Sequence, residues 1–338
     1  MMIFFTSPIG LGHATRDVAI AEKLQDDLLF ISGEAAVKLL ERKGYNVLDV
    51  YRPEKFIIES GQLRHSFKWL IDYYSYYKKC KEISKGILEK NTGLIISDED
   101  FAAVALGEDM SRKRVLITDI FETHFASGSA SLIEKRMNKK MQKMMRTCDC
   151  VIIPDIGDNK DNIQYVGPIV RQLGADRSTL RKKFGFNKRT IVVSIGGTDA
   201  GKYLIGKAIA AYRKLKLDTE LVIVSGPSLS LPDSPEYRNL GFVDNLHEVI
   251  CAADLVISLA GRSTMDESIA YGTPGIFIPI KNHFEQEYGA ARLGYKYDDI
   301  FRLESLIMEK IDQRNNVVDV DGAARAAKII CSLSESNK

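Results

Sequence analysis

A histidine directly follows a glycine-rich turn near the start of the chain. The stretch SPIGLGHATR, residues 7–16, ends an apolar run and leads into a helical pattern, with Gly10 and Gly12 just ahead of His13. Glycines at this spacing let a backbone turn tightly beside a phosphate, whereas an imidazole titrates near neutral pH and can move a proton. The stretch predicts either a nucleotide cradle or a catalytic base. A dinucleotide site is disfavoured, because Thr15 stands where the third glycine of G-x-G-x-x-G belongs.

Two further glycine turns follow apolar runs in the second half of the chain. GGTDAGKY, residues 196–203, nearly spells the G-x-x-x-x-G-K-[ST] loop, but Tyr203 replaces the residue whose hydroxyl holds magnesium. The backbone amides of such a loop can still hold a diphosphate without a metal. In AGRSTMDESIA, residues 260–270, Ser263 or Thr264 could cap a helix, and Ser263 with Asp266 fits a capping box. Glu267 comes one turn into that helix, where a carboxylate could accept hydrogen bonds from ribose hydroxyls.

Two aspartates end apolar runs in the first half, in LIISD and VLITD. If both runs are parallel strands, Asp98 and Asp119 lie at the same edge of one sheet. The DED triplet at residues 98–100 also resembles a metal-binding D-x-D pattern. A helix N-cap is the favoured interpretation of the triplet, and no metal site is predicted.

The composition is that of an ordinary globular protein with balanced charge. The chain has 338 residues, which favours two domains, and 47 basic against 45 acidic side chains give a net charge of +2. This balance speaks against a nucleic-acid partner. No apolar run reaches the roughly 20 residues of a membrane span, and no signal peptide is recognisable. The five cysteines are scattered, so we expect a reduced, cytoplasmic protein without zinc or disulfides.

Short apolar runs alternate with helical patterns in two series. MIFFTSP, LLFIS and RVLITD are examples from the first series, and TIVVSIGG, ELVIVSGP and ADLVISLAG come from the second. Such near-continuous apolar strands between helices predict an α/β fold with parallel sheets covered on both faces. We expect a first domain over residues 1–154, a linker at 155–168 and a second domain over 169–338. Ligands of such sheets bind at the carboxyl ends of the strands.

The segment over residues 56–81 differs from its surroundings. It contains the only tryptophan, four tyrosines and several basic residues. An amphipathic helix that packs on its own domain is one interpretation. An acceptor-binding lid or a membrane-surface contact is the other, because aromatic and basic side chains suit that boundary.

Four motifs together resemble a known family. GLGHATR (10–16), YVGPIVR (165–171), SIGGTDAG (194–201) and NHFEQEYGAARLG (282–294) follow one another in the order typical of GT-B glycosyltransferases, specifically the family 28-like group related to the peptidoglycan N-acetylglucosaminyltransferase. The resemblance implies two Rossmann-like domains facing across a cleft. The acceptor would bind mainly to the first domain and a nucleotide-sugar donor, a UDP-sugar, mainly to the second. The last helix could pack back on the first domain.

The resemblance also assigns residues to the donor. Glycines and hydroxyl residues would line the diphosphate, Phe242 and Val243 would hold the base through their backbone, and Glu267 would bind the ribose. Glu285 and Gln286 would meet the sugar. The complete set of donor-binding residues is Gly12, Gly196, Gly197, Thr198, Phe242, Val243, Gly261, Arg262, Ser263, Thr264, Glu267, Glu285 and Gln286.

In this family His13 serves as the general base, which answers the question that the first motif raises. A helix N-terminus would favour its neutral, proton-accepting form. Asp98 or Asp119 would orient it. Arg16 would reach a phosphate or the acceptor, or it would pair with a carboxylate. The implied activity is that of an inverting hexosyltransferase that needs no metal or other cofactor. Its acceptor would be lipid-linked or a glycan, at the inner membrane face. A nucleotide-sugar hydrolase or a non-catalytic nucleotide-binding protein on the same scaffold are the alternatives.

Overall fold

The computed structural model describes residues 1–53, 57–64, 67–124, 130–196, 201–227, 229–232 and 234–335. The chain divides into two compact units. The first contains Met1–Phe56, His65–Ile169 and Val320–Lys338, and the second contains Ile57–Arg64 and Val170–Asp319.

The first unit is built on a parallel sheet of seven strands in the order β3-β2-β1-β6-β7-β8-β9. Its strands are β1 (Met2–Thr6), β2 (Leu28–Ser32), β3 (Asn46–Asp49), β6 (Leu94–Asp98), β7 (Arg114–Ile117), β8 (Cys150–Ile153) and β9 (Ile163–Tyr165). Its helices are α1 (Gly12–Ala21), α2 (Glu34–Arg42), α3 (Phe67–Lys90), α4 (Phe101–Asp109), α5 (Ala130–Thr147) and α12 (Gly322–Glu335). Residues 163–165, which fall in the predicted linker, thus form the edge strand β9.

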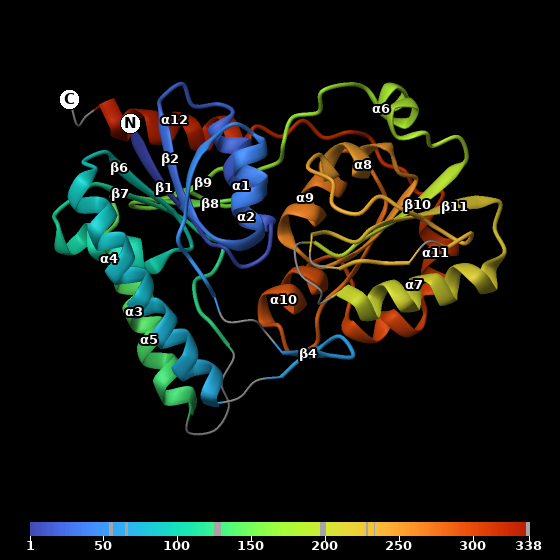
Figure 1. The fold of residues 1–338 in the computed structure, drawn as a ribbon, viewed down its shortest axis with the longest axis horizontal. Helices are drawn as coiled ribbons and strands as arrows, with labels where there is room; N and C mark the ends of the chain where they lie inside the picture. Colours follow the sequence, from blue (N-terminus) through green and yellow to red (C-terminus); the bar gives the residue numbers. More distant parts are fainter. Residues whose placement is uncertain are drawn as a thin grey trace. The chain divides into compact units, whose positions relative to one another are not determined.

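Alternation along β1 explains why this sheet is covered on both faces. Successive side chains of a strand point to opposite faces. Met2 and Phe4 pack with α1, α2 and α12, whereas Ile3 and Phe5 pack with α3 and α4. All four side chains are fully buried, and Figure 1 shows helices on both faces of the sheet. Burial of a side chain of this size stabilises the fold by about 1.5–3 kcal/mol.

The C-terminal helix belongs to the first unit although it comes last in the sequence. Small residues on one side of α12, such as Ala323 and Ala326, let it approach α1 closely, and Ile330 is fully buried between them. The start of the helix is equally tight, because a Cβ on Gly322 would lie 2.2 Å from the carbonyl oxygen of Pro168.

The second unit contains a parallel sheet of five strands in the order β12-β11-β10-β13-β14. Its strands are β10 (Arg189–Ser194), β11 (Thr219–Val224), β12 (Arg238–Asn239), β13 (Leu255–Leu259) and β14 (Gly275–Ile278). Its helices are α6 (Arg177–Phe184), α7 (Lys202–Leu215), α8 (Leu246–Ala252), α9 (Arg262–Ala270), α10 (Phe284–Arg292), the 3-10 helix η2 (Tyr297–Phe301) and α11 (Leu303–Lys310). Two parallel sheets with helices between their strands confirm the predicted α/β class.

A short hairpin from the first half of the sequence packs on the second unit. Strands β4 (Ile58–Glu59) and β5 (Gln62–Leu63) pair with each other. The backbone of Lys281 then exchanges hydrogen bonds with both Gly61 and Leu63. Tyr297 donates from its hydroxyl to the carbonyl oxygen of Ser60 at 2.7 Å. The helix predicted over residues 56–81 is therefore shorter at its start, because α3 begins at Phe67.

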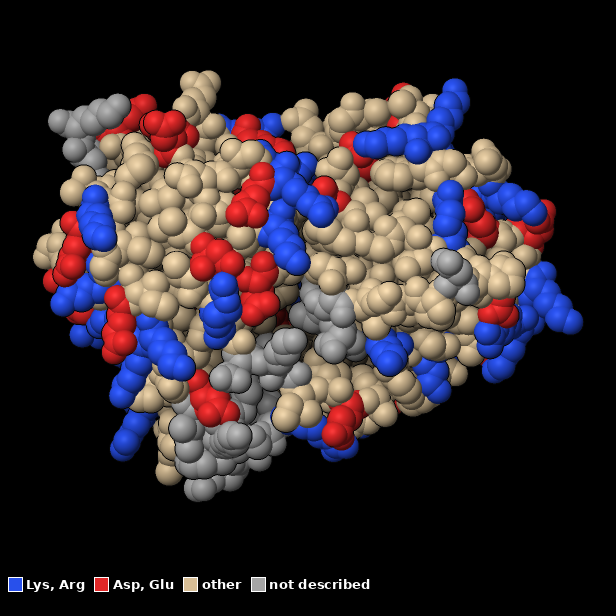
Figure 2. Space-filling view, in the orientation of Figure 1, with Lys and Arg blue, Asp and Glu red and all other residues tan. Residues whose placement is uncertain are grey.

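Charged side chains of both signs are interspersed on the face of the molecule in Figure 2. The view shows no continuous basic tract on that face, which agrees with a net charge of +2.

Candidate active site

Each sheet has one place where the strand order reverses. In the first unit this switch point lies between β1 and β6, and in the second it lies between β10 and β13. Open parallel sheets bind ligands outside the carboxyl ends of the strands at such points. The turns that follow β1, β10 and β13 are the three glycine turns found in the sequence. Topology therefore places two candidate sites, one in each unit.

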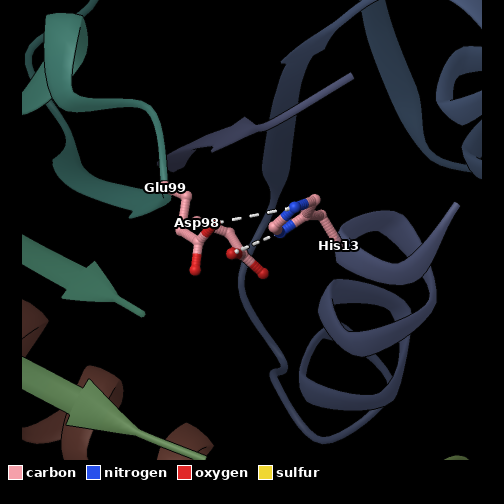
Figure 3. Close-up of side chains that lie close together, drawn as sticks. All are labelled: His13, Asp98 and Glu99. Atoms are coloured by element: carbon pink, nitrogen blue, oxygen red, sulfur yellow. Dashed lines mark hydrogen bonds and ion pairs between the residues drawn. The ribbon is translucent and has the colours of Figure 1, made fainter. Parts of the chain in front are cut away.

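Helix α1 presents three polar side chains to the end of β6. Gly10 turns the backbone after β1 with φ +78°, a conformation that favours glycine, and α1 begins two residues later. His13, Arg16 and Asp17 follow at spacings of three and four residues, which lie on one face of a helix. That face meets Asp98, the last residue of β6, as Figure 3 shows for the histidine.

Asp98 is the centre of this cluster and its side chain is fully buried. Its Oδ1 lies 2.9 Å from Nδ1 of His13. Arg16 donates from Nε to Oδ2 of Asp98 at 2.8 Å, and its Nη2 donates to Oδ1. When Nδ1 of His13 carries a hydrogen that donates to Asp98, Nε2 is left as the proton acceptor of the imidazole. The geometry is that of an oriented histidine base.

The pKa values of the two residues shift in opposite directions. Burial lowers the pKa of His13, but Asp98 and Glu99 outweigh it, and the net result is a pKa of about 9. Burial raises the pKa of Asp98, but Arg16 and His13 together hold it well below its usual range. The expectation that the helix N-terminus keeps His13 neutral is therefore wrong, because two nearby carboxylates stabilise the imidazolium more strongly.

Glu99 is a site residue that the sequence analysis missed. Its Oε2 lies 3.7 Å from Nε2 of His13, and Thr118 donates to its Oε1 at 3.2 Å. Its backbone adopts φ +58°, which is uncommon for a residue with a side chain and occurs often at functional sites. The DED triplet was the only signal in the sequence, and it was interpreted as a helix N-cap. That interpretation is confirmed for Asp100, which accepts hydrogen bonds from Ala102 and Ala103 at the start of α4.

Asp98 takes the orienting position that the sequence left open between two aspartates. Asp119 follows β7, and its charge contributes to raising the pKa of Arg16 rather than that of His13. Arg16 itself is buried against Asp98 and Glu99. Its charge thus neutralises the carboxylate that holds the base.

One group in the described residues has the spacing of metal ligands. Single ligand atoms of His13, Asp98 and Glu99 all lie within 4.8 Å of one another. Both oxygens of Asp98 already accept hydrogen bonds from Arg16, and its Oδ1 also contacts His13. The positive guanidinium beside the same carboxylate opposes a divalent cation there, so these residues fit an ion-pair network better than a metal.

A hollow opens beside the cluster in the first unit. It is partly open to solvent, and Ser7, Ile9 and Glu99 form one side. Tyr73, Tyr76 and Tyr77 of α3 form another, with hydroxyl groups whose pKa values burial raises. This hollow has the aromatic lining that suits a sugar ring or an apolar chain.

The second site is built from backbone at the ends of β10 and β13. Gly196 turns the chain after β10 with φ +75°, and Gly261 is the N-cap of α9. Ser263 and Thr264 lie in the first turn of α9. The predicted capping box is wrong, because the helix starts at Arg262 and Asp266 accepts a hydrogen bond from that arginine at 2.8 Å. The N-terminus of α9 therefore points out of the switch point, where an anion is favoured.

A buried ion pair supports this second site. Arg171 donates to Oε1 of Glu267 at 2.9 Å and to Oε2 at 3.3 Å, and both side chains are almost fully buried. The same guanidinium donates to the carbonyl oxygen of Asp244 at 2.9 Å. Arg171 thus fixes the glutamate that was assigned to ribose and the loop that holds Phe242 and Val243. Its role was not recognised in the sequence, although the motif that contains it was.

The remaining predicted donor residues fall into three groups. Glu285 and Gln286 lie in the first turn of α10, where Oε1 of Gln286 accepts from the backbone N–H of Ile280 at 3.1 Å. Gly12 is the first residue of α1, in the first unit. Gly197 and Thr198 lie outside the described residues.

Within the described ranges, no helix combines the length and the apolar character needed to cross a membrane.

Comparison with known proteins identifies the family. Residues 190–316 match the model of the glycosyltransferase family 28 C-terminal domain. An uncharacterized glycosyltransferase of Methanosarcina acetivorans is 30% identical over 322 residues, which cover 86% of this chain and 81% of that protein. A UDP-N-acetylglucosamine–N-acetylmuramyl-(pentapeptide) pyrophosphoryl-undecaprenol N-acetylglucosamine transferase of Bacillus cereus is 25% identical over 361 residues, with 99% of each chain covered.

A solved structure supports the fold. The kitacinnamycin glycotransferase superimposes with a TM-score of 0.64 at 12% identity, covering 99% of this chain and 94% of that one. The sequence matches and the two parallel sheets agree with the family resemblance of the four motifs. The chain belongs to the glycosyltransferases with a family 28 C-terminal domain and the GT-B fold, as a distant relative of the peptidoglycan N-acetylglucosamine transferases.

Proposed function

We propose that this glycosyltransferase is an inverting, metal-independent enzyme that moves a hexose from a UDP-sugar to an acceptor hydroxyl, with His13 as the general base. The observation that carries the proposal is the His13–Asp98 pair at the β1/β6 switch point. A hydroxyl is a poor nucleophile until its proton is removed, and an oriented imidazole can remove it. Asp98 holds the Nδ1 side, so Nε2 would take the proton.

The reaction forms one bond, breaks one bond and transfers one proton. The acceptor oxygen forms a bond to the anomeric carbon while the bond from that carbon to the diphosphate oxygen breaks. The hydroxyl proton passes to Nε2 of His13, and the electron pair of the broken bond leaves with the nucleoside diphosphate. Attack from the side opposite to the leaving group inverts the anomeric configuration. Asp98 stabilises the imidazolium that forms, as a carboxylate does in other His–Asp pairs.

The second unit would hold the donor. Gly196 and the N-terminus of α9 with Arg262 would meet the diphosphate. The positive end of the α9 dipole, together with the guanidinium of Arg262, would stabilise the leaving diphosphate without a metal. Arg171 holds Glu267 in place, so the glutamate would offer the ribose an ordered carboxylate. The carboxylate oxygens would then accept hydrogen bonds from both Arg171 and the ribose. Uridine is favoured because the Bacillus cereus relative is named for UDP-N-acetylglucosamine.

The tyrosine-lined hollow is the candidate acceptor site. Its wall includes Glu99, whose carboxylate lies 3.7 Å from Nε2 of His13. An acceptor that fills the hollow would therefore bring a hydroxyl close to the base. Tyr73, Tyr76 and Tyr77 would pack against a sugar ring or an apolar chain, with their hydroxyls available at its edge.

Helix α5 supports contact with a membrane that carries a lipid-linked acceptor. Six exposed cations follow one another along it, and its one acidic residue, Glu134, is buried. Leu132 and Ile133 near its start are 64% and 43% exposed. Basic and apolar side chains side by side favour an anionic lipid surface. The cations are Lys135, Arg136, Lys139, Lys140, Lys143 and Arg146. Sedimentation with vesicles tests this, because binding should need anionic lipid and should weaken with salt.

The donor assignment is tested by thermal unfolding with UDP, GDP, CMP, ATP or NAD, each with and without EDTA. A ligand at about 100 times its Kd should add roughly 2.7 kcal/mol of stability. We expect a shift with UDP that EDTA does not change. A shift that only ATP with magnesium produces would contradict the proposal.

Release of UDP from UDP-sugars then tests the reaction. A transferase releases UDP faster when an acceptor is added and yields an inverted product. Full release without any acceptor would identify a nucleotide-sugar hydrolase instead. Binding of UDP with no turnover for any sugar would identify a non-catalytic protein.

A further inference from the structure

A second carboxyl group lies against Asp98, and the proposed reaction makes no use of it. Asp17 follows His13 by four residues on α1, and its side chain is fully buried. Thr6 is the β1 residue that pairs with Asp98 in the sheet, and it donates from Oγ1 to Oδ2 of Asp17 at 2.6 Å. The other oxygen of Asp17, Oδ1, receives no hydrogen bond from any described residue. A buried carboxylate oxygen without a donor is costly, so the group needs another explanation.

Neighbouring charges decide which of the two carboxyl groups keeps a proton. Asp17 and Asp98 are both fully buried and lie close enough for the charge of Asp98 to raise the pKa of Asp17, and two neighbouring buried carboxylates do not both ionise. Asp98 accepts from two cations, Arg16 and His13. Asp17 accepts from the neutral hydroxyl of Thr6. Burial, followed by the charge of Asp98, raises the pKa of Asp17 well above its usual range, against weaker opposing contributions from Thr6 and Arg16.

We propose that Asp17 is a protonated carboxylic acid that donates a hydrogen bond from Oδ1 to the carboxylate of Asp98, and that it is a positioning residue for the His13–Asp98 pair. Hydrogen bonds then run from Thr6 to Asp17, and from Asp17, Arg16 and His13 to Asp98. Every oxygen of the two carboxyl groups has a partner in this scheme, including the one that otherwise lacks a donor. Asp98 is held from three sides, which fixes the direction in which it orients the imidazole.

The proposal predicts how His13 titrates in variants of its buried neighbour. Asp17→Asn keeps a neutral donor toward Asp98 and an acceptor for Thr6, so the pKa of His13 should stay as in the natural protein. Leucine has a volume similar to that of aspartate but no hydrogen-bond donor. In Asp17→Leu the carboxylate of Asp98 therefore loses a donor and interacts more strongly with His13, so the pKa of His13 should rise. The other charged groups around the pair are Arg16 on α1, Glu99 after β6 and Asp119 after β7. None of them changes in either variant.

The experiment is an NMR titration of the histidine side chains in the full chain, which needs no donor or acceptor. The chain has five histidines, so His13→Gln identifies the resonance of interest and the other four serve as references. If Asp17 were ionised, Asp17→Asn would remove a negative charge beside the pair and lower the pKa of His13. That fall would overturn the proposal. It can be read from Asp17→Asn alone if Asp17→Leu fails to fold.

A carboxyl-labelled aspartate spectrum gives a direct second readout. The resonance that disappears in Asp17→Asn should lie at the position of a protonated acid near neutral pH, and a carboxylate position there would contradict the assignment. The functional consequence rests on the proposed role of His13. Asp17→Leu should lower kcat/KM about tenfold or more, and Asp17→Asn should recover most of that loss. If His13→Gln kept full turnover, the proposed base would be wrong, whereas the two titrations would still decide the state of Asp17.

Discussion

The two switch points of this protein use the same sheet geometry for different chemistry. Between β1 and β6 the site consists of buried side chains, with His13, Arg16 and Asp17 converging on Asp98. Between β10 and β13 it consists mainly of backbone, with a left-handed conformation at Gly196 and the N-terminus of α9. A buried ion pair close to the second site, Arg171–Glu267, also contacts a loop carbonyl.

The two sites are suited to different tasks. Moving a proton requires a group whose charge changes, and its pKa must be set by neighbours that do not move. Holding a diphosphate requires only fixed dipoles, which backbone amides supply without titrating. We therefore expect the first site to be sensitive to charge and the second to be sensitive to backbone conformation.

The largest effect is expected from Asp98→Asn. This change leaves Arg16 buried without its carboxylate, which should cost about 3–5 kcal/mol of unfolding free energy. The matched control is Asp49→Asn, because Asp49 pairs with Arg52 at the surface, where both side chains are about half exposed. That control should lose less than about 1 kcal/mol. Equal losses in chemical denaturation would contradict the claim that the first site depends on buried charge.

The pH dependence of turnover should follow the raised pKa of His13. A general base must be neutral, and with a pKa of about 9 only about one His13 in a hundred is neutral near pH 7. We expect kcat/KM to rise with pH and to level off above about 9. Asp98→Asn removes the carboxylate that contributes most to raising this pKa, so the rise should move to lower pH. A profile that levels off near the ordinary pKa of 6.5 would contradict the assignment.

A smaller effect is expected from Gly196→Ala. A Cβ there would meet nothing within 4 Å, so the change tests the φ of +75° alone and should cost about 1–2 kcal/mol. Gly206→Ala is the matched control, because Gly206 lies in the exposed middle of α7 with equally open space. It should stabilise the protein by about 0.5–1 kcal/mol. UDP binding should weaken only in the first variant. Equal UDP affinity in the two variants would contradict the claim that the second site depends on backbone conformation.

The sequence was sufficient to predict the α/β class and the three glycine turns. Alternating apolar runs and helices reflect local conformational preferences. A turn that requires positive φ can also be recognised in a single sequence, because glycine occupies that position. His13 could be found because it stands directly beside such a turn.

The partners of these residues could not be predicted from local patterns. No local pattern singles out Asp17, because Asp98 lies 81 positions later in the numbering. Arg171 meets Glu267 over an even longer separation. Similarly, residues 57–64 join the second unit through Lys281 and Tyr297, which no local signal indicates. The uncommon backbone of Glu99 is set by its position after β6 rather than by its residue type.

The central claim is that His13 moves the proton while other residues hold the donor. The most direct test is His13→Gln, measured both for UDP affinity and for acceptor-dependent UDP release. We expect UDP affinity to stay within about threefold and kcat to fall by about 10² to 10⁴, the usual loss for a general base. Release of UDP by His13→Gln at the rate of the natural protein would contradict it.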